Sequence, residues 1–170
     1  LMIVLAITAT FMVVEFPAGL ISGSLALVAD AGHMLTDVGA LGLSLFTAML
    51  ARRHADLKRT YGYLRWEILA ALINGATLFG LSAWVVYEAV GRIREPHPID
   101  TGIFLVVAIA GLIANVVSLS VLHGLQNHSL NVRGAYLHIL GDILGSVAAL
   151  AAAVIVSVTG WTIADPIVSI

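Results

Sequence analysis

Long stretches without a charged side chain are the feature that most limits how this chain can fold. Three of them, at 68–87, 101–122 and 143–164, contain 20 to 22 residues and lack Asp, Glu, Lys, Arg and His. About 20 apolar residues in a helix span the hydrocarbon core of a bilayer. Only 11% of the 170 residues are charged, whereas about a quarter are charged in a soluble domain. These values exclude an ordinary soluble enzyme and predict a polytopic membrane protein.

Shorter uncharged stretches, interrupted by single acidic residues, predict the remaining helices. Pro17, Gly19, Ser22, Gly23 and Ser24 indicate a tight turn between the first two. The sequence therefore predicts an all-α fold, a polytopic membrane helix bundle with six transmembrane helices in the full protein. We expect helices at residues 1–21, 24–50, 64–90, 101–123 and 130–158, and a sixth that starts near 161 and is incomplete at 170. Since the chain also begins without a polar leader, we expect it to be part of a longer protein.

The basic residues predict how the bundle is oriented. Five of the eight Lys and Arg residues lie between 52 and 65, and Arg133 falls on the same side, whereas Arg92 and Arg94 fall on the other. Cytoplasmic loops carry an excess of basic residues, so we expect the N-terminus and the loops at 51–65 and 124–130 in the cytoplasm. A net charge of −2, without a basic cluster that is interleaved with aromatic residues, indicates no nucleic-acid partner. The absence of cysteine excludes thiolate metal sites.

Two copies of the pattern His-x-x-x-Asp lie inside predicted membrane helices. One is His33 with Asp37, and the other is His138 with Asp142. This spacing places both side chains on one helical face. A charge at the bilayer centre costs roughly 2.5–3.5 kcal/mol, and that cost falls if the two pairs face each other around a divalent cation. Two imidazoles and two carboxylates fit tetrahedral zinc, whereas Cu(I) prefers sulfur and Ca²⁺ or Mg²⁺ prefers more oxygen ligands.

Small residues near both motifs predict close helix packing. Gly32 and Gly39 flank His33, and Gly141 and Gly145 follow His138, so we expect the two motif helices to approach each other there.

Other polar residues in the predicted spans leave alternatives open. Asp30 either orients His33 through its second ring nitrogen or forms a hydrogen bond between helices. Glu15 is either a proton carrier that lines a cavity or a structural acid. Asn74 and Asn115 are interpreted as hydrogen-bonding residues between helices.

The ligand set predicts exchange of metal for protons. A metal binds neutral imidazole and ionised carboxylate, so binding releases protons and protons displace the metal. Each motif lies on the second helix of a three-helix half, which is typical of the inverted repeats of secondary transporters. The alternatives are an intramembrane metal-binding sensor and an intramembrane metalloenzyme. No His-Glu-x-x-His or Gly-x-Ser-x-Gly motif supports an enzyme.

Three segments resemble the cation diffusion facilitator family, and within it the cobalt–zinc–cadmium efflux proteins. They are Ser24–Asp37, Ser129–Asp142 and Arg59–Glu67, the last of which resembles the start of the family's third helix. The resemblance implies a homodimer that exports Zn²⁺ in exchange for protons, with Co²⁺ and Cd²⁺ as open alternatives. It implies one transmembrane transport domain over 1–170, with the family's cytoplasmic C-terminal domain absent. The ligands it implies are His33, Asp37, His138 and Asp142.

The sequence departs from the family pattern at two places, which concern a second metal site and the type of family member. Arg59 and Tyr63 occupy positions where some members have histidines of a second metal site, so we expect that site to be missing. The histidine-rich loop of many eukaryotic members is reduced to His123 and His128, which favours a bacterial type in the cytoplasmic membrane. With His54 and His97, they are interpreted as surface residues.

Overall fold

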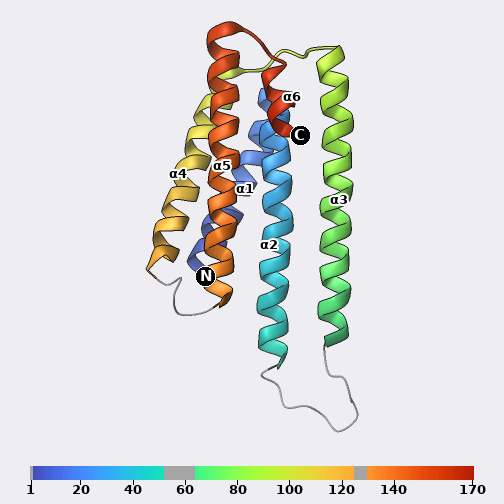
Figure 1. Cartoon of the computed structure of the whole chain (residues 1–170), viewed down its shortest axis with the longest axis vertical. Helices are drawn as coiled ribbons and strands as arrows, with labels where there is room; N and C mark the ends of the chain where they lie inside the picture. Colours follow the sequence, from blue (N-terminus) through green and yellow to red (C-terminus); the bar gives the residue numbers. More distant parts are fainter. Residues whose placement is uncertain (1, 52–63, 125–129) are drawn as a thin grey trace.

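The computed structural model describes residues 2–51, 64–124 and 130–170, which form a bundle of helices (Figure 1). All regular secondary structure in these described residues is helical, as the uncharged stretches predicted. The helices are α1 (Met2–Ser22), α2 (Leu25–Ala51), α3 (Leu64–Arg94), α4 (Thr101–His123), α5 (Leu130–Thr159) and α6 (Ala164–Ser169).

Most predicted boundaries lie within one residue of the observed ones, but α3 continues four residues beyond the expected 90. Arg92 donates from Nε to Glu88 Oε1 at 3.0 Å, one turn earlier on the same helix. Such an i, i+4 pair stabilises a helix rather than ending it. The sixth helix starts at Ala164 instead of 161 because Gly160, with φ of +69°, ends α5 and a short turn follows.

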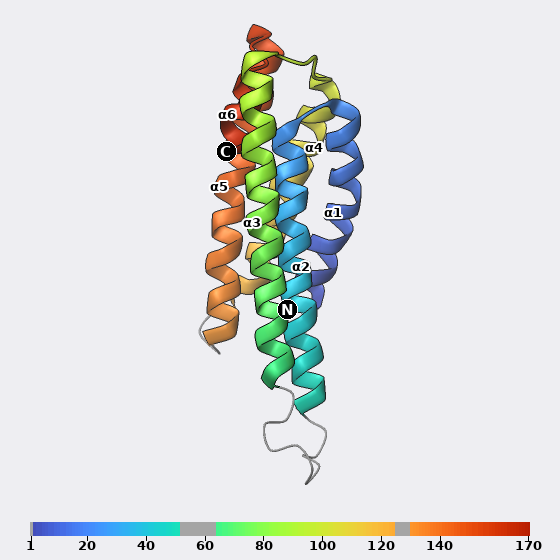
Figure 2. The ribbon, with the colours of Figure 1, turned by 90° about the vertical axis from the view of Figure 1, so that its right-hand side faces the viewer.

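The helices are arranged with α2 near the centre. α2 contacts each of the other five, whereas α3 contacts only α2 and α6 among the described helices. Figure 2 shows α3 beside α2 along most of its length. The core near the α1–α2 turn consists of Phe104 and of small and branched residues from four helices: Ala26, Leu27, Val107, Ala108, Ala149, Ala152, Ala153, Val156 and Ala164.

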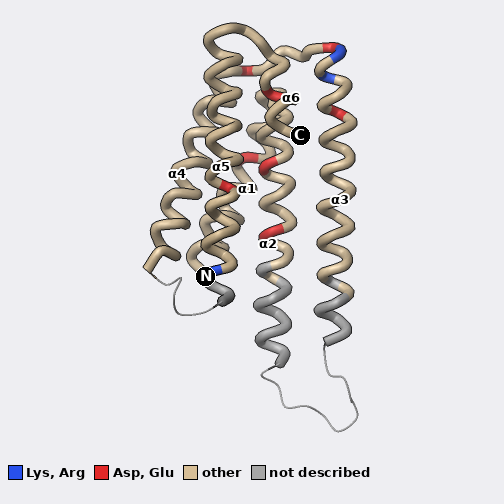
Figure 3. Tube along the Cα trace, viewed as in Figure 1, with Lys and Arg blue, Asp and Glu red and all other residues tan. Residues whose placement is uncertain are grey.

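The surface of the bundle is apolar, as expected of a protein that lies in a membrane. α1, α4 and the Arg133–Thr159 part of α5 are long and apolar enough to cross a bilayer. α2 and α3 contain 27 and 31 residues, which exceeds the length of about 20 that a crossing needs. Figure 3 shows acidic residues at mid-height of the bundle, whereas the described basic residues lie towards its ends.

The tight turn predicted between α1 and α2 is present at Gly23, which has φ of +74°. Only glycine adopts this conformation without strain, and a Cβ here would lie 3.0 Å from the carbonyl oxygen of Pro98. The backbone N–H of Asp100 donates to the carbonyl of Ser22 at 2.8 Å, and Arg92 donates to the carbonyl of Gly23. The turn is therefore fixed against the linker between α3 and α4.

A buried carboxylate that the sequence did not single out joins α6 to the start of α2. Asp165 is 0% exposed and accepts hydrogen bonds from Ser24 Oγ at 2.6 Å and from the backbone N–H groups of Leu25 at 2.7 Å and Ala26 at 3.1 Å. The first N–H groups of a helix have no partner within the helix, and a negative charge there is favourable. Asp165 thus caps α2 from another helix, two turns before His33.

Candidate metal centre

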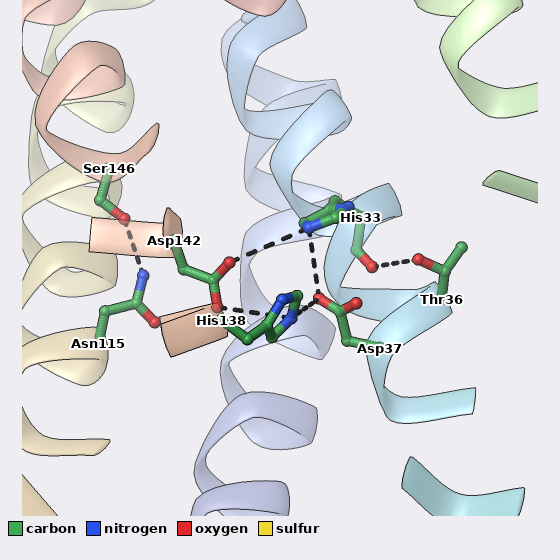
Figure 4. Close-up of polar contacts among 7 residues, drawn as sticks. All are labelled: His33, Thr36, Asp37, Asn115, His138, Asp142 and Ser146. Atoms are coloured by element: carbon green, nitrogen blue, oxygen red, sulfur yellow. Dashed lines mark hydrogen bonds and ion pairs between the residues drawn. The ribbon is translucent and has the colours of Figure 1, made fainter. Parts of the chain in front are cut away.

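Both His-x-x-x-Asp motifs point to the same place in the bundle. α2 presents His33 and Asp37, and α5 presents His138 and Asp142, as Figure 4 shows. One potential ligand atom from each residue lies within 4.8 Å of all the others. Residues 105 positions apart in the sequence are thus brought together by two helices that approach each other at this level.

The distances across the helix pair are as short as those within each helix. His138 Nε2 lies 3.1 Å from Asp37 Oδ2, and His33 Nε2 lies 4.0 Å from Asp142 Oδ1. Within one helix, the corresponding distances are 3.6 Å for His33 and Asp37 and 3.9 Å for His138 and Asp142. Zinc bonds of about 2.0–2.2 Å separate the ligand atoms of a tetrahedral site by about 3.3–3.6 Å. The measured N···O distances of 3.1–4.0 Å lie around this separation, so the four side chains are close enough together to hold a zinc ion.

The carboxylates of the cluster are deeper than the imidazoles. The side chains of Asp37 and Asp142 are 17% and 21% exposed, against 41% and 44% for His33 and His138. The two imidazole rings lie 5.7 Å apart at an angle of 47°, so they do not stack on each other. In Figure 4 the His138 ring lies between the carboxylates of Asp142 and Asp37, and the His33 ring lies above Asp37. The imidazoles are therefore the more accessible ligands of the cluster.

Polar contacts around the cluster join neighbouring elements. Asn115 Nδ2 of α4 donates to Ser146 Oγ of α5 at 2.8 Å, which confirms the predicted role of Asn115 between helices. Within α2, Thr36 Oγ1 donates to the carbonyl of His33 at 2.7 Å. Asn74 of α3 faces α2, because a Cβ at Gly39 would lie 3.5 Å from its Oδ1; its role as a hydrogen-bonding residue stays a prediction.

The expected role of the glycines is only partly correct. A Cβ at Gly32 would lie 2.5 Å from Leu81 Cδ2, so Gly32 does allow close packing, but of α2 on α3 rather than on α5. A Cβ at Gly141 or Gly145 would meet no atom of the described residues within 4 Å. Both glycines are exposed, because α5 packs on α4 through its alanine face instead.

The two alternatives for Asp30 stay open. Asp30 forms no hydrogen bond or ion pair with His33 in the described part of the chain, so the structure does not show it orienting the imidazole. Its role as a hydrogen-bonding residue between helices stays a prediction.

Among the described residues, the remaining histidines lie outside the cluster. His97 and His123 are exposed, as predicted, and His123 Nδ1 lies 3.5 Å from the hydroxyl of Tyr136. The predictions for the loops, and for His54, Arg59, Tyr63 and His128 within them, lie outside the described residues.

Comparison with known proteins places the whole chain in one family. The family model described as the cation efflux transmembrane domain matches residues 1–170. The zinc transporter ZitB of Pectobacterium atrosepticum is 52% identical over 96% of this chain and 52% of its own length. The metal cation efflux system protein CzcD of Cupriavidus metallidurans is 46% identical over 100% of this chain and 54% of its own.

A third relative has a name that includes protons. The cadmium, cobalt and zinc/H(+)-K(+) antiporter of Bacillus subtilis is 43% identical over 94% of this chain and 52% of its own length. This chain therefore spans about half the length of the relatives that it matches. The match to the family model over every residue, together with these identities, shows that the chain belongs to the cation diffusion facilitator family.

Proposed function

We propose that this chain carries Zn²⁺ across a membrane in exchange for protons, and that His33, Asp37, His138 and Asp142 bind the ion on its way. The observation that carries the proposal is the convergence of four ligand atoms from α2 and α5 within 4.8 Å of one another. Two relatives named as a zinc transporter and an antiporter support the choice of cargo and of counter-ion.

The chemistry of the four ligands supports exchange rather than simple passage. Imidazole binds a metal only when its ring nitrogen is unprotonated, and each carboxylate must be ionised. Metal and protons therefore compete for the same atoms, and each expels the other. Because imidazole titrates near neutral pH, modest changes of pH on either side of the membrane decide which of them is bound.

The ligand types favour zinc but leave related metals in the proposal. Two nitrogen and two oxygen ligands in a tetrahedral arrangement suit Zn²⁺, and Co²⁺ accepts the same ligands. Cd²⁺ remains a third cargo because the Bacillus relative is named for all three metals. A metalloenzyme would need a coordination position open to water, whereas here four side chains converge on one point.

We further propose that residues 1–170 act as one transport domain of a multi-pass protein in a bacterial cytoplasmic membrane, and that the protein is a homodimer. The bacterial origin of the relatives supports the location.

Flux measurements test the proposal. The full-length protein is reconstituted into vesicles that contain a zinc-sensitive dye, and uptake is followed with and without an imposed pH gradient. We expect uptake that the gradient drives, and its loss in His33→Ala and Asp142→Ala. The matched control is His97→Ala, which removes an exposed histidine far from the cluster and should leave uptake unchanged. Undiminished uptake in the two cluster variants would refute the site.

A further inference from the structure

Asp165 links the end of one ligand-bearing helix to the start of the other. α5 ends at Thr159, and the chain then turns back into α6, which carries Asp165. Its Oδ1 accepts hydrogen bonds from Ser24 Oγ at 2.6 Å and from the N–H of Ala26 at 3.1 Å. Its Oδ2 accepts from the N–H of Leu25 at 2.7 Å. The chain that leaves α5 therefore returns to hold the first turn of α2.

α6 is the main bridge between the two helices that carry the metal ligands. α2 and α5 touch each other at few points in the described part of the chain, whereas α6 packs on both of them. Among the same residues, α4 packs on α5 but barely reaches α2, and α1 packs on α2 but not on α5. Figure 1 shows α6 beside the first turns of α2. The position of α2 relative to α5 therefore depends on how α6 is attached to both.

The hydrogen bonds of Asp165 fix this attachment more sharply than the apolar core around it. That core consists largely of alanine side chains from the joined helices, such as Ala26, Ala152 and Ala164. The burial of apolar surface has no preferred direction, whereas a hydrogen bond constrains both distance and angle. Asp165 and Ser24 are 0% exposed, so water does not take the place of the bonds between them.

The capped turn and the ligands of α2 belong to one continuous helix. His33 follows Leu25 by eight residues, which is about 12 Å at a rise of 1.5 Å per residue. No proline lies within α2, and sharp kinks in helices arise mostly at proline or where the backbone hydrogen bonds are interrupted. The level of the first turn therefore sets the level at which His33 and Asp37 face α5.

We propose that Asp165 is a positioning residue of the metal site: by holding the first turn of α2 to the chain that leaves α5, it sets the level at which His33 and Asp37 face His138 and Asp142. The inference rests on the proposed function, because it takes these four residues as the ligands. Asp165 does not bind the ion. It acts on the two distances across the helices, of 3.1 and 4.0 Å, whereas the distances within each helix do not depend on it.

The distance between α2 and α5 tests the positioning role without metal. Spin labels are attached to a full-length protein whose only cysteines are introduced by Leu35→Cys on α2 and Leu144→Cys on α5. These two side chains are 55% and 72% exposed, and residues 1–170 contain no cysteine of their own. Electron paramagnetic resonance of the metal-free protein then gives the distribution of distances between the labels.

We expect Asp165→Ala to shift or broaden this distribution, because the first turn of α2 loses its attachment. Asp165→Asn keeps one acceptor oxygen and should change the distribution less. The matched control is Asp100→Ala, which removes the side-chain cap of α4, a helix without ligands, and should match the wild type. An unchanged distribution in Asp165→Ala overturns the proposal.

Zinc affinity tests whether this position matters to the site. Below the melting temperature of every variant, Asp165→Ala should weaken zinc binding about tenfold, the lower end of the loss that follows removal of a ligand-orienting group. The same change is then made in a background that lacks both α5 ligands, His138→Ala with Asp142→Ala. There a positioning residue should have less than about a twofold effect, because no ligand of α5 is left to meet and the two losses do not add.

The comparison of backgrounds separates positioning from folding. A residue that only keeps α2 folded would weaken zinc binding equally in both, so equal losses would overturn the proposal, as would no loss in the otherwise unaltered protein. Asp100→Ala should bind zinc as the wild type does. Failure of the wild type to bind zinc would refute the proposed function instead, while the distances between the labels would still decide whether Asp165 positions α2.

Discussion

The cap that α6 places on α2 gives a sharp prediction about stability. Replacing Asp165 with Ala removes the acceptor of three hydrogen bonds, from Ser24 Oγ and from the N–H groups of Leu25 and Ala26. The hydroxyl of Ser24 also accepts from the N–H of Leu27 at 3.3 Å, and its own hydrogen can rotate towards another acceptor. The other two N–H groups have no such alternative, and water does not reach them because Leu25 is 0% and Ala26 5% exposed.

The change in the free energy of unfolding follows from the two N–H groups, of Leu25 and Ala26, that lose their acceptor. A buried donor without a partner costs about 1–3 kcal/mol, so Asp165→Ala should lower the free energy of unfolding by about 2–6 kcal/mol. For a chain of this length, 1 kcal/mol corresponds to about 2–4 °C, which predicts a fall in Tm of roughly 10 °C. The matched control is Asp100→Ala. Asp100 caps α4 through Gly102 and Ile103 at 3.0 and 3.1 Å but is exposed, so water can replace it.

The assay is thermal unfolding of the full-length protein in detergent micelles, followed by the circular dichroism of its helices. Loss of an exposed cap costs about 0.5–2 kcal/mol, and the Asp100→Ala variant should therefore melt only a few degrees below the wild type. Asp165→Asn should fall between the two Ala variants, because its one amide oxygen can still accept. If Asp165→Ala and Asp100→Ala melted together, the interpretation of Asp165 as a buried cap would be wrong.

Three further predictions concern the cluster and the packing around it. Asp37→Ala and His138→Ala should each weaken zinc binding at least about 100-fold, which is equivalent to about 2.7 kcal/mol. The assay is competition for zinc with a chelating dye. A zinc affinity within threefold of the wild type would contradict the assignment of these residues as ligands. Lowering the pH from about 7.5 to about 5.5 should weaken zinc binding progressively, because protonated imidazoles compete with the metal, and a pH-independent affinity in calorimetry would exclude histidine ligands. Gly32→Ala should destabilise the fold by about 1–3 kcal/mol, since its Cβ would lie 2.5 Å from Leu81 Cδ2. Gly145→Ala should be neutral or stabilising, because the space around Gly145 is open. Equal melting temperatures of the two variants would disprove the difference in packing.

Much of the fold could be predicted because membranes restrict it strongly. A stretch of 20 uncharged residues has few alternatives to a membrane helix, so the helices were found within a few residues. The four residues of the cluster could also be predicted, since an i, i+4 spacing fixes which side chains share a helical face. Two helical faces that each carry a His and an Asp can bind one cation together, which favours contact between them.

The contacts between helices were harder to predict because they depend on how the helices are rotated. Asp165 caps α2 over a separation of 140 residues, and no local pattern pairs a carboxylate with a distant helix start. Gly32 and Gly145 look alike in the sequence, yet one faces Leu81 and the other faces open space.

The division of the cluster between two helices has a mechanical consequence. The His–Asp pairs within α2 and α5, at 3.6 and 3.9 Å, are set by the helices themselves, whereas the pairs across them, at 3.1 and 4.0 Å, depend on the register of one helix against the other. A slide of about 5.4 Å, one helical turn, would separate the cluster into two half-sites without changing a single rotamer. Each half-site would have only two ligands and would hold the ion loosely. The affinity of the cluster for metal therefore depends on the axial position of α2 relative to α5.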